Sequence, residues 1–141
     1  MPPDFLTTNK KAIAEFRANE GRCGPPFEDY PIILVTMTGA KTGRTLCSPL
    51  AYSTDGGDLV VIASMAGAKN NPNWYHNLKA HPEVTIEIGT EEYEATAMLT
   101  EGEERDRLYA AQAEQMPIFD TYAQKAEPRI IPVFRIVRKS T

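Results

Sequence analysis

The sequence has no long apolar run. Nowhere do about 18 consecutive apolar residues occur, so no segment predicts a helix that crosses a membrane. The amino-terminal stretch, M-P-P-D-F-L-T-T-N-K-K, also lacks the apolar centre of a signal peptide. We therefore expect a cytoplasmic protein that touches a membrane, if at all, only peripherally at its inner face.

Cysteine and positive charge are both scarce. Cys23 and Cys47 form no C-x-x-C pair, which predicts reduced thiols and no zinc knuckle. The formal net charge is −4, and acidic residues gather at 91–94 and 101–104. Because a nucleic-acid groove needs a continuous basic face, we exclude nucleic acid as a partner.

Motifs for metal, hydrolytic and nucleotide chemistry are absent as well. His76 and His81 belong to no H-E-x-x-H pattern, so they predict no metal site. Ser48 and Ser64 lie in no G-x-S-x-G sequence, although a distant histidine could still meet either of them in space. Neither G-x-G-x-x-G nor G-x-x-x-x-G-K-[ST] occurs, which removes the common dinucleotide and P-loop sites.

The composition is that of an ordinary globular protein. At 141 residues, with 42% hydrophobic and 24% charged residues, the chain predicts one domain over 1–141. Residues 1–18 predict an amphipathic helix that Thr7, Thr8 or Asn9 would cap. Residues 19–31 predict an extended loop. Packing of this helix on its own domain is favoured over a place on a membrane surface, since its apolar stripe is narrow.

Strand signals dominate the rest of the chain. I-I-L-V-T-M-T from Ile32 reads as a strand covered on both faces, and Leu46–Thr54 and Leu59–Ser64 flank a D-G-G-D hairpin. Pro49 inside the second run predicts a sheet edge or a bulge. Val84–Ile88, Tyr93–Leu99 and I-I-P-V-F-R-I-V complete a set of six strands.

Helices fill the gaps between these strands. Asn71 as a cap and Pro72 as the first helical residue predict a helix that ends before Pro82. Thr100 and Glu103 form a capping-box pattern before a second helix, which Pro117 separates from a third at about 118–126. Six strands with so few helices predict an α+β protein built on a small antiparallel barrel.

A basic turn interrupts the first two strands in the stretch Thr36–Pro49. Gly39 and Gly43 allow backbone angles that other residues avoid, and the residues around Gly43 supply two cations and a hydroxyl: Lys41, Thr42 and Arg44. Two interpretations are open: an ordinary solvated hairpin turn, or a grip for an anion.

The predicted helix at Asn71 offers a second anion-binding feature, because its first backbone N–H groups carry a positive partial charge. Trp74 and Tyr75 lie one turn into that helix. They would either wall a pocket for a flat ring or simply face the core, as aromatic residues on an inner helix face commonly do.

Three segments together resemble one known family. They are T-G-A-K-T-G-R with S-P-L, then A-S-M-A-G-A-K-N-N-P-N-W-Y-H-N-L-K-A-H-P-E-V, then I-I-P-V. Through these segments the chain resembles the deazaflavin-dependent nitroreductases and quinone reductases of actinobacteria. The resemblance covers nearly the whole chain. The resemblance implies a flavin-reductase-like split β-barrel and, as cofactor, the deazaflavin coenzyme F-420, with flavin mononucleotide (FMN) less favoured.

The resemblance also assigns positions to the cofactor and the substrate. It puts the phosphate and polyglutamate tail on Lys41, Thr42 and Arg44. It places the ring against a strand segment, a loop and a helix start: Ser48, Pro49, Leu50, Ala63, Ser64, Met65, Asn71, Trp74 and Tyr75. The segment from Met116 to Tyr122, with Phe119, would form the substrate side.

Several residues depart from the family pattern. Members often carry arginine where Leu46 stands and lysine where Met65 stands. Met116 and Phe119 replace tyrosines of close relatives, so only Tyr122 keeps a hydroxyl there. We therefore expect a more apolar substrate pocket than in the tyrosine-rich members.

The resemblance predicts an oxidoreductase that passes hydride from reduced coenzyme F-420 to a hydrophobic electrophile. Both a monomer and a homodimer remain open for this chain. A quinone, an enone or an unsaturated lactone of the coumarin or aflatoxin type would serve as acceptor, and a nitroaromatic is a further candidate. No catalytic residue is assigned, because the protein need only orient the reactants, exclude water and admit a proton. The alternative is a non-catalytic binding protein for deazaflavin, FMN or an apolar ligand such as a fatty acid.

Overall fold

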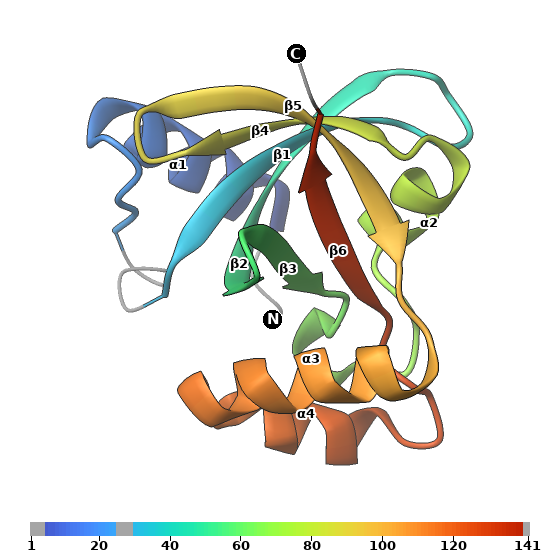
Figure 1. Cartoon of the computed structure of the whole chain (residues 1–141). Coiled ribbons are helices and arrows are strands. Elements are labelled where there is room, and N and C mark those ends of the chain that lie inside the picture. Colours follow the sequence, from blue (N-terminus) through green and yellow to red (C-terminus); the bar gives the residue numbers. More distant parts are fainter. Residues whose placement is uncertain (1–4, 25–29, 140–141) are drawn as a thin grey trace.

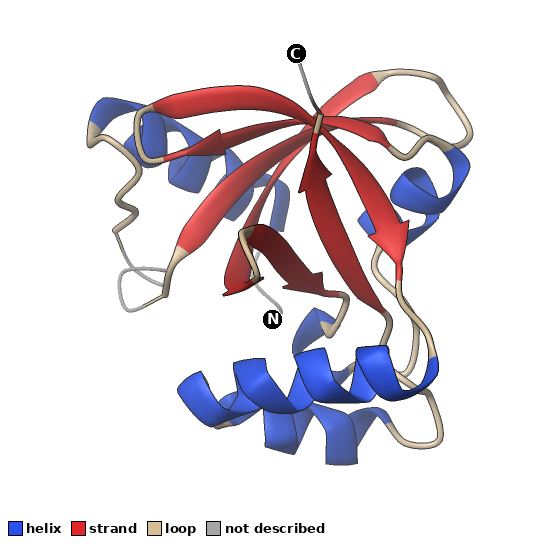
Figure 2. Cartoon of the chain, in the orientation of Figure 1, coloured by secondary structure: helices blue, strands red, loops and turns tan. Residues whose placement is uncertain are grey.

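A closed antiparallel barrel of six strands forms the centre of the molecule (Figure 2). The computed structural model describes residues 5–24 and 30–139. Around the barrel the strands follow the order β1-β2-β3-β6-β5-β4, and pairing of β1 with β4 closes it. Their bounds are β1 Ile32–Thr38, β2 Thr45–Asp55, β3 Asp58–Ile62, β4 Glu83–Ile88, β5 Glu91–Leu99 and β6 Val133–Arg138.

Helices cover the outside of this barrel (Figure 1). The α1 helix packs beside β2, α2 lies against β1, and the antiparallel pair α3 and α4 packs on the outer face of β3 and β6. Their bounds are α1 Phe5–Ala18, α2 Asn73–Ala80, α3 Gly102–Gln115 and α4 Ile118–Ala126, and a short 3₁₀ turn, η1, spans Met65–Gly67. Among the described residues, no helix is long and apolar enough to cross a membrane.

The first strand shows why its sequence is apolar throughout. Ile33, Val35 and Met37 point into the barrel, whereas Ile32 and Leu34 pack outside with Phe16 of α1. Both faces of β1 are therefore buried, as its unbroken run predicts. Of the α1 side chains whose burial the structure describes, Phe16 and Ile13 pack in the same contact.

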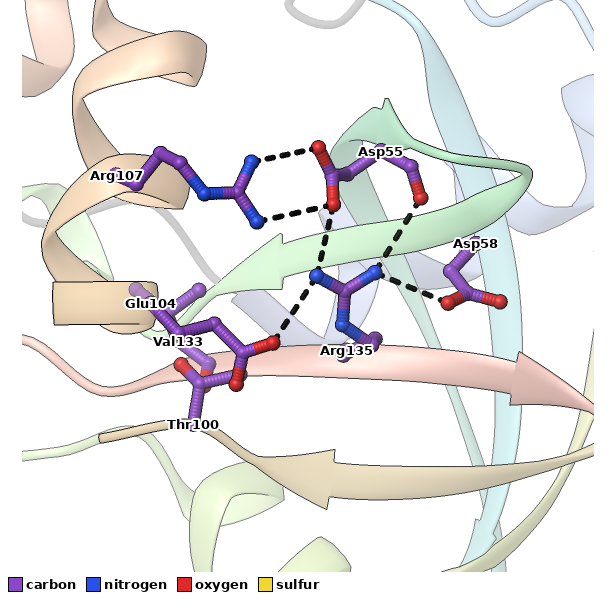
Figure 3. A network of polar contacts seen from close by, with 7 residues as sticks. All are labelled: Asp55, Asp58, Thr100, Glu104, Arg107, Val133 and Arg135. Atoms are coloured by element: carbon purple, nitrogen blue, oxygen red, sulfur yellow. Dashed lines mark hydrogen bonds and ion pairs between the residues drawn. The ribbon is translucent and has the colours of Figure 1, made fainter. Parts of the chain in front are cut away.

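The two C-terminal helices are part of the core rather than a loose flap. Val60 and Val133 face away from the barrel interior and pack with Leu108 of α3 and Phe119 of α4. The Arg135 guanidinium reinforces this packing, because it joins Asp55 of β2 to Glu104 of α3 (Figure 3). The helix pair is thus held by both apolar and charged contacts.

Three predicted helix starts are wrong. The first helix begins at Phe5, before all three of its predicted caps. Pro72 rather than Asn71 occupies the N-cap position of α2. The α3 helix begins at Gly102 after Glu101, because the Thr100 hydroxyl donates to the Val133 carbonyl oxygen at 2.8 Å and is not available to cap a helix.

Every strand except β1 differs from its predicted bounds by one to three residues at one or both ends. β3 ends at Ile62, so Ala63 and Ser64 belong to the following loop. β6 begins at Val133, after the prolyl residue of I-I-P-V. Of the predicted loop over 19–31, residues 25–29 lie outside the described part of the chain.

Candidate functional site

The site is organised by a split between β2 and β3. These strands pair from Tyr52 to Asp55 of β2, so within the described residues the segment 45–51 has β1 as its only strand neighbour. Pro49 lies in that segment opposite Leu34. Because proline has no N–H to donate, its position on an unpaired strand edge agrees with the edge predicted from the sequence.

The open segment of β2 presents its side chains to two different surroundings. Leu50 packs with the barrel interior, whereas Cys47 and Ala51 pack toward α1. Side chains alternate along a strand, so Ser48 shares the face of Leu50, and Pro49 shares that of Cys47 and Ala51. A ligand along the open edge would therefore meet all three predicted residues, Ser48, Pro49 and Leu50, mainly through their backbone.

The basic turn leads directly into this open segment. The Gly39 N–H donates to the Arg44 carbonyl oxygen at 2.8 Å, and the Gly43 N–H donates to the Gly39 carbonyl oxygen at 3.0 Å. Gly43 has φ of 70°, a left-handed conformation that favours glycine. The Thr42 hydroxyl accepts a hydrogen bond from the Arg44 N–H at 3.2 Å, so Thr42 stabilises the turn itself.

The two cations of the turn extend into solvent. Lys41 and Arg44 are exposed, and neither side chain pairs with a carboxylate elsewhere in the described part of the chain. Leu46 follows on the strand and is 43% exposed, a high value for leucine. The turn therefore offers two unpaired positive charges beside an exposed apolar side chain.

Helix α2 meets the basic turn, but not through its first residues. Asn77 lies in the second turn of α2, and its Oδ1 atom accepts a hydrogen bond from the Ala40 N–H at 2.9 Å. The basic turn and α2 are therefore in contact, as the sequence suggested. The contact is made by Asn77, which the sequence interpretation did not single out.

Trp74 and Tyr75 form part of the core and are only half exposed to solvent. Their ring centroids lie 6.0 and 5.9 Å from that of Phe134, which is buried inside the barrel. These tilted and edge-on contacts are typical of packed aromatic side chains. Tyr75 has two further neighbours, because the His76 ring lies edge-on at 5.0 Å and Lys79 Nζ lies 5.4 Å from the Tyr75 ring centroid.

The loop after β3 carries the next group of predicted residues. Ala63 and Ser64 are buried, and the Ala63 N–H donates to the Pro132 carbonyl oxygen at 2.9 Å. Met65 is 48% exposed and has φ of 47°, which is unusual for a residue with a side chain. This loop begins where β3 diverges from β2, so it forms the second border of the split.

Arg129 organises that loop, and the sequence interpretation missed it. Its guanidinium donates to the carbonyl oxygens of Ala63, Ser64 and Ala68 and to Oδ1 of Asn71, at 2.6 to 3.1 Å. The Asn71 side chain thus accepts a hydrogen bond from Arg129 and does not cap α2. The one sequence feature that could have indicated this role is the position of Arg129, a charged residue directly before the apolar residues I-I-P-V.

The predicted substrate side is largely packed. Met116 and Phe119 are buried between α3, α4 and the barrel, and Tyr122 is half-buried. The Phe119 ring lies edge-on to Tyr109 and Tyr122, with centroids 6.3 and 5.3 Å away. Burial raises the pKa of the Tyr122 hydroxyl. Tyr122 is therefore the most accessible of the three side chains.

Two clefts of about 520 and 330 Å³ lie elsewhere, near the turn between β4 and β5. None of the predicted site residues lines them. The smaller cleft has an excess of carboxylates, so its charge suits an anionic cofactor poorly, whereas Arg22 and Glu91 balance in the larger one. Because neither cleft contains a predicted residue, we place the candidate site at the split of β2 and β3.

Comparisons with known proteins agree with this architecture. A family model described as F420H(2)-dependent quinone reductase matches residues 8–137. An F420H(2)-dependent quinone reductase of Mycobacterium tuberculosis and a putative one of Mycobacterium bovis are each 34% identical over 129 residues, covering 89% of this chain and 87% of the relative.

Solved structures show the same fold. A structure described as an F420-H2 dependent reductase is 37% identical, covers 75% of this chain and 93% of its own, and has a TM-score of 0.69. The heme storage protein HutZ of Vibrio cholerae has a TM-score of 0.60 at 16% identity, covers 92% of this chain and 89% of its own, and shares the fold alone. With the family model matching almost end to end and relatives above 30% identity, the chain belongs to the F420H(2)-dependent quinone reductase family of deazaflavin-dependent oxidoreductases.

Proposed function

We propose that this chain binds reduced coenzyme F-420 at the split between β2 and β3 and catalyses reduction of a hydrophobic electrophile. When bound, this coenzyme supplies a hydride. Family membership supports the proposal, and the observation in the structure that carries it is the pair of unpaired cations, Lys41 and Arg44, at the head of an open strand edge.

The donor set fits an anionic tail. Lys41 and Arg44 have no acidic partner among the described residues, and Thr42 stands between them. A phosphate or carboxylate placed there would gain charge-assisted hydrogen bonds without breaking an existing ion pair. We assign these three residues to the tail.

The ring would occupy the split itself. Backbone groups of Ser48, Pro49 and Leu50 border one side of it, and the loop 63–65 borders the other. Asn71 uses its Oδ1 atom for Arg129 and keeps its Nδ2 group for a ligand, and Trp74 and Tyr75 would border the ring with the parts of their side chains that stay exposed. These groups bind and orient a flat ring and keep water from it.

The acceptor would approach from the side of α4. Met116 and Phe119 are buried beneath this side, and half-buried Tyr122 supplies its hydroxyl. This lining suits a hydrophobic acceptor, and the Tyr122 hydroxyl would donate to its carbonyl or nitro oxygen. A proton could come from solvent or from the Tyr122 hydroxyl.

One assay tests the reaction. Purified protein, reduced coenzyme F-420 and menadione should give cofactor oxidation well above the protein-free rate. A flat trace with menadione, an unsaturated lactone and a nitroaromatic would contradict the proposal.

A second candidate function is a binding protein without turnover. It is favoured by exposed Leu46 and Met65, which put apolar side chains where cations would serve a charged tail. Fluorescence titration with coenzyme F-420 and with FMN separates the two functions. The reductase should prefer the deazaflavin strongly, whereas a general binder of apolar or flavin ligands should not.

A further inference from the structure

We propose that Arg129 is a positioning residue for the cofactor: it holds the loop 63–71 so that backbone N–H groups of Ser64 and Met65 face the ligand. This role rests on the proposed function, because it concerns the border of the same split.

The contacts of Arg129 span both ends of the loop. Nη1 donates to the Ala63 carbonyl oxygen at 3.1 Å and to Asn71 Oδ1 at 2.6 Å. Nη2 donates to the carbonyl oxygens of Ser64 and Ala68 at 2.8 and 2.7 Å, and Nε donates to the Ala68 oxygen at 2.9 Å. Every nitrogen of the guanidinium is therefore engaged with this one loop.

These partners are all neutral. Within the described chain Arg129 forms no ion pair, and burial lowers the pKa of its guanidinium. A half-buried cation without a carboxylate is costly unless its hydrogen bonds are satisfied. The arrangement is stable because four acceptors converge on the planar fork of an arginine, a geometry that lysine cannot reproduce.

The direction of these carbonyl groups fixes the direction of the neighbouring N–H groups. In a trans peptide the C=O and the following N–H point in opposite directions. Because the Ala63 and Ser64 carbonyls point at Arg129, the N–H groups of Ser64 and Met65 point away from it. Neither donates to another described residue, so both remain available to a ligand.

The loop also makes contacts of its own with α4. Lys69 Nζ donates to the carbonyl oxygen of Lys125 at 2.7 Å and to that of Glu127, just after α4. A Cβ atom on Gly67 would lie only 2.9 Å from Lys125 Cβ and 3.0 Å from the Tyr122 carbonyl oxygen. The loop thus packs directly on α4, the helix of the substrate side.

The test compares Arg129→Met and Arg129→Lys with the matched control Arg105→Met. Arg105 also donates from Nε and Nη2 to a backbone carbonyl, that of Ile131, but it does not touch the loop. Thermal melts should show a lower Tm for all three variants. Fluorescence titration should show roughly tenfold weaker binding of coenzyme F-420 for Arg129→Met, little change for Arg105→Met and partial recovery for Arg129→Lys.

Amide chemical shifts give a second readout that general destabilisation would not move. Addition of coenzyme F-420 should shift the Ser64 and Met65 amides in the wild type and in Arg105→Met, but much less in Arg129→Lys. Wild-type protein that binds no coenzyme F-420 would overturn the proposed function. Wild-type binding with unchanged affinity in folded Arg129→Met or Arg129→Lys would overturn only the positioning role, as would equal weakening in Arg105→Met.

Discussion

Asn77 and Ala40 join α2 to the basic turn. The Asn77 Oδ1 atom accepts the Ala40 N–H at 2.9 Å, and its Nδ2 group lies 3.6 Å from Met37 Sδ. Asn77 is buried and Ala40 is half-buried, so solvent would only partly replace this hydrogen bond if Asn77 were truncated. The bridge therefore sets the position from which Lys41 and Arg44 extend.

We expect Asn77→Ala to lower the free energy of unfolding by about 1–3 kcal/mol, because the Ala40 N–H loses its acceptor. It should also weaken binding of coenzyme F-420. Urea unfolding and fluorescence titration measure the two effects. Asn19→Ala is the control, since Asn19 is exposed and should cost no more than about 0.5 kcal/mol. Equal losses in the two variants would contradict a special role for Asn77.

The double variant Lys41→Ala/Arg44→Ala should weaken cofactor binding while leaving the unfolding free energy nearly unchanged, because two exposed cations without ion pairs among the described residues add little stability. The loss of affinity should shrink at high salt. Lys10→Ala/Lys11→Ala changes the net charge equally on exposed residues of α1 and serves as control. Unchanged affinity in the Lys41/Arg44 variant would refute the anion grip.

Sequence rules predicted the elements whose signals are local. The apolar run of β1 has the bounds Ile32–Thr38 expected for it. The D-G-G-D turn joins β2 to β3 with positive φ at Gly56 and Gly57, as a tight hairpin requires. Pro117 separates α3 from α4. In each case a few adjacent residues determine the outcome.

Two predicted helix caps were wrong because their side chains form long-range hydrogen bonds instead. Thr100 fits a capping box by spacing, yet its hydroxyl bonds to Val133 on β6. Asn71 fits a helix cap, yet its side chain accepts from Arg129. Both partners come from distant parts of the chain, so no nearby residue could reveal them. The assignment of the cofactor residues stays a prediction, and the two preceding substitutions test part of it.

Ser53 and Gln112 form an isolated polar pair between β2 and α3. The Ser53 hydroxyl donates to Gln112 Oε1 at 2.8 Å, while Gln112 Nε2 is buried with no partner among the described residues. We expect Ser53→Ala to destabilise by about 1–3 kcal/mol, because it leaves the whole amide unsatisfied.

The matched change at the other residue should behave differently. Gln112→Met removes the unsatisfied amide and keeps a flexible side chain of similar length, so it should cost less than Ser53→Ala. The double variant should then be close to Gln112→Met alone, since serine can keep a hydrogen bond to a nearby backbone group and gains little from an apolar partner. Urea unfolding of the three variants decides this, and strictly additive losses would contradict the pairing.

Asp55 connects three elements through two arginines. Its carboxylate accepts from Arg107 of α3 and from Arg135 of β6, with distances from 2.8 to 3.2 Å (Figure 3). Hydrogen bonds from Arg107 and then Arg135 hold the pKa of Asp55 well below its usual range. A carboxylate whose pKa is lower in the folded state stabilises that state fully above its unfolded pKa, which is about 3.9.

We therefore expect Asp55→Asn to lower the urea midpoint most at neutral pH. As pH falls below about 4, the unfolded wild-type chain takes up the proton first, and the advantage of the wild type over the variant fades toward the folded pKa. Urea unfolding at pH 7 and near pH 2.5 measures this narrowing. Glu91→Gln is the control, because Glu91 pairs with Arg138 where both side chains are largely exposed, and it should have little effect at either pH. A difference between wild type and Asp55→Asn that stayed constant or grew at low pH would show that Asp55 does not couple α3 to the barrel through its charge.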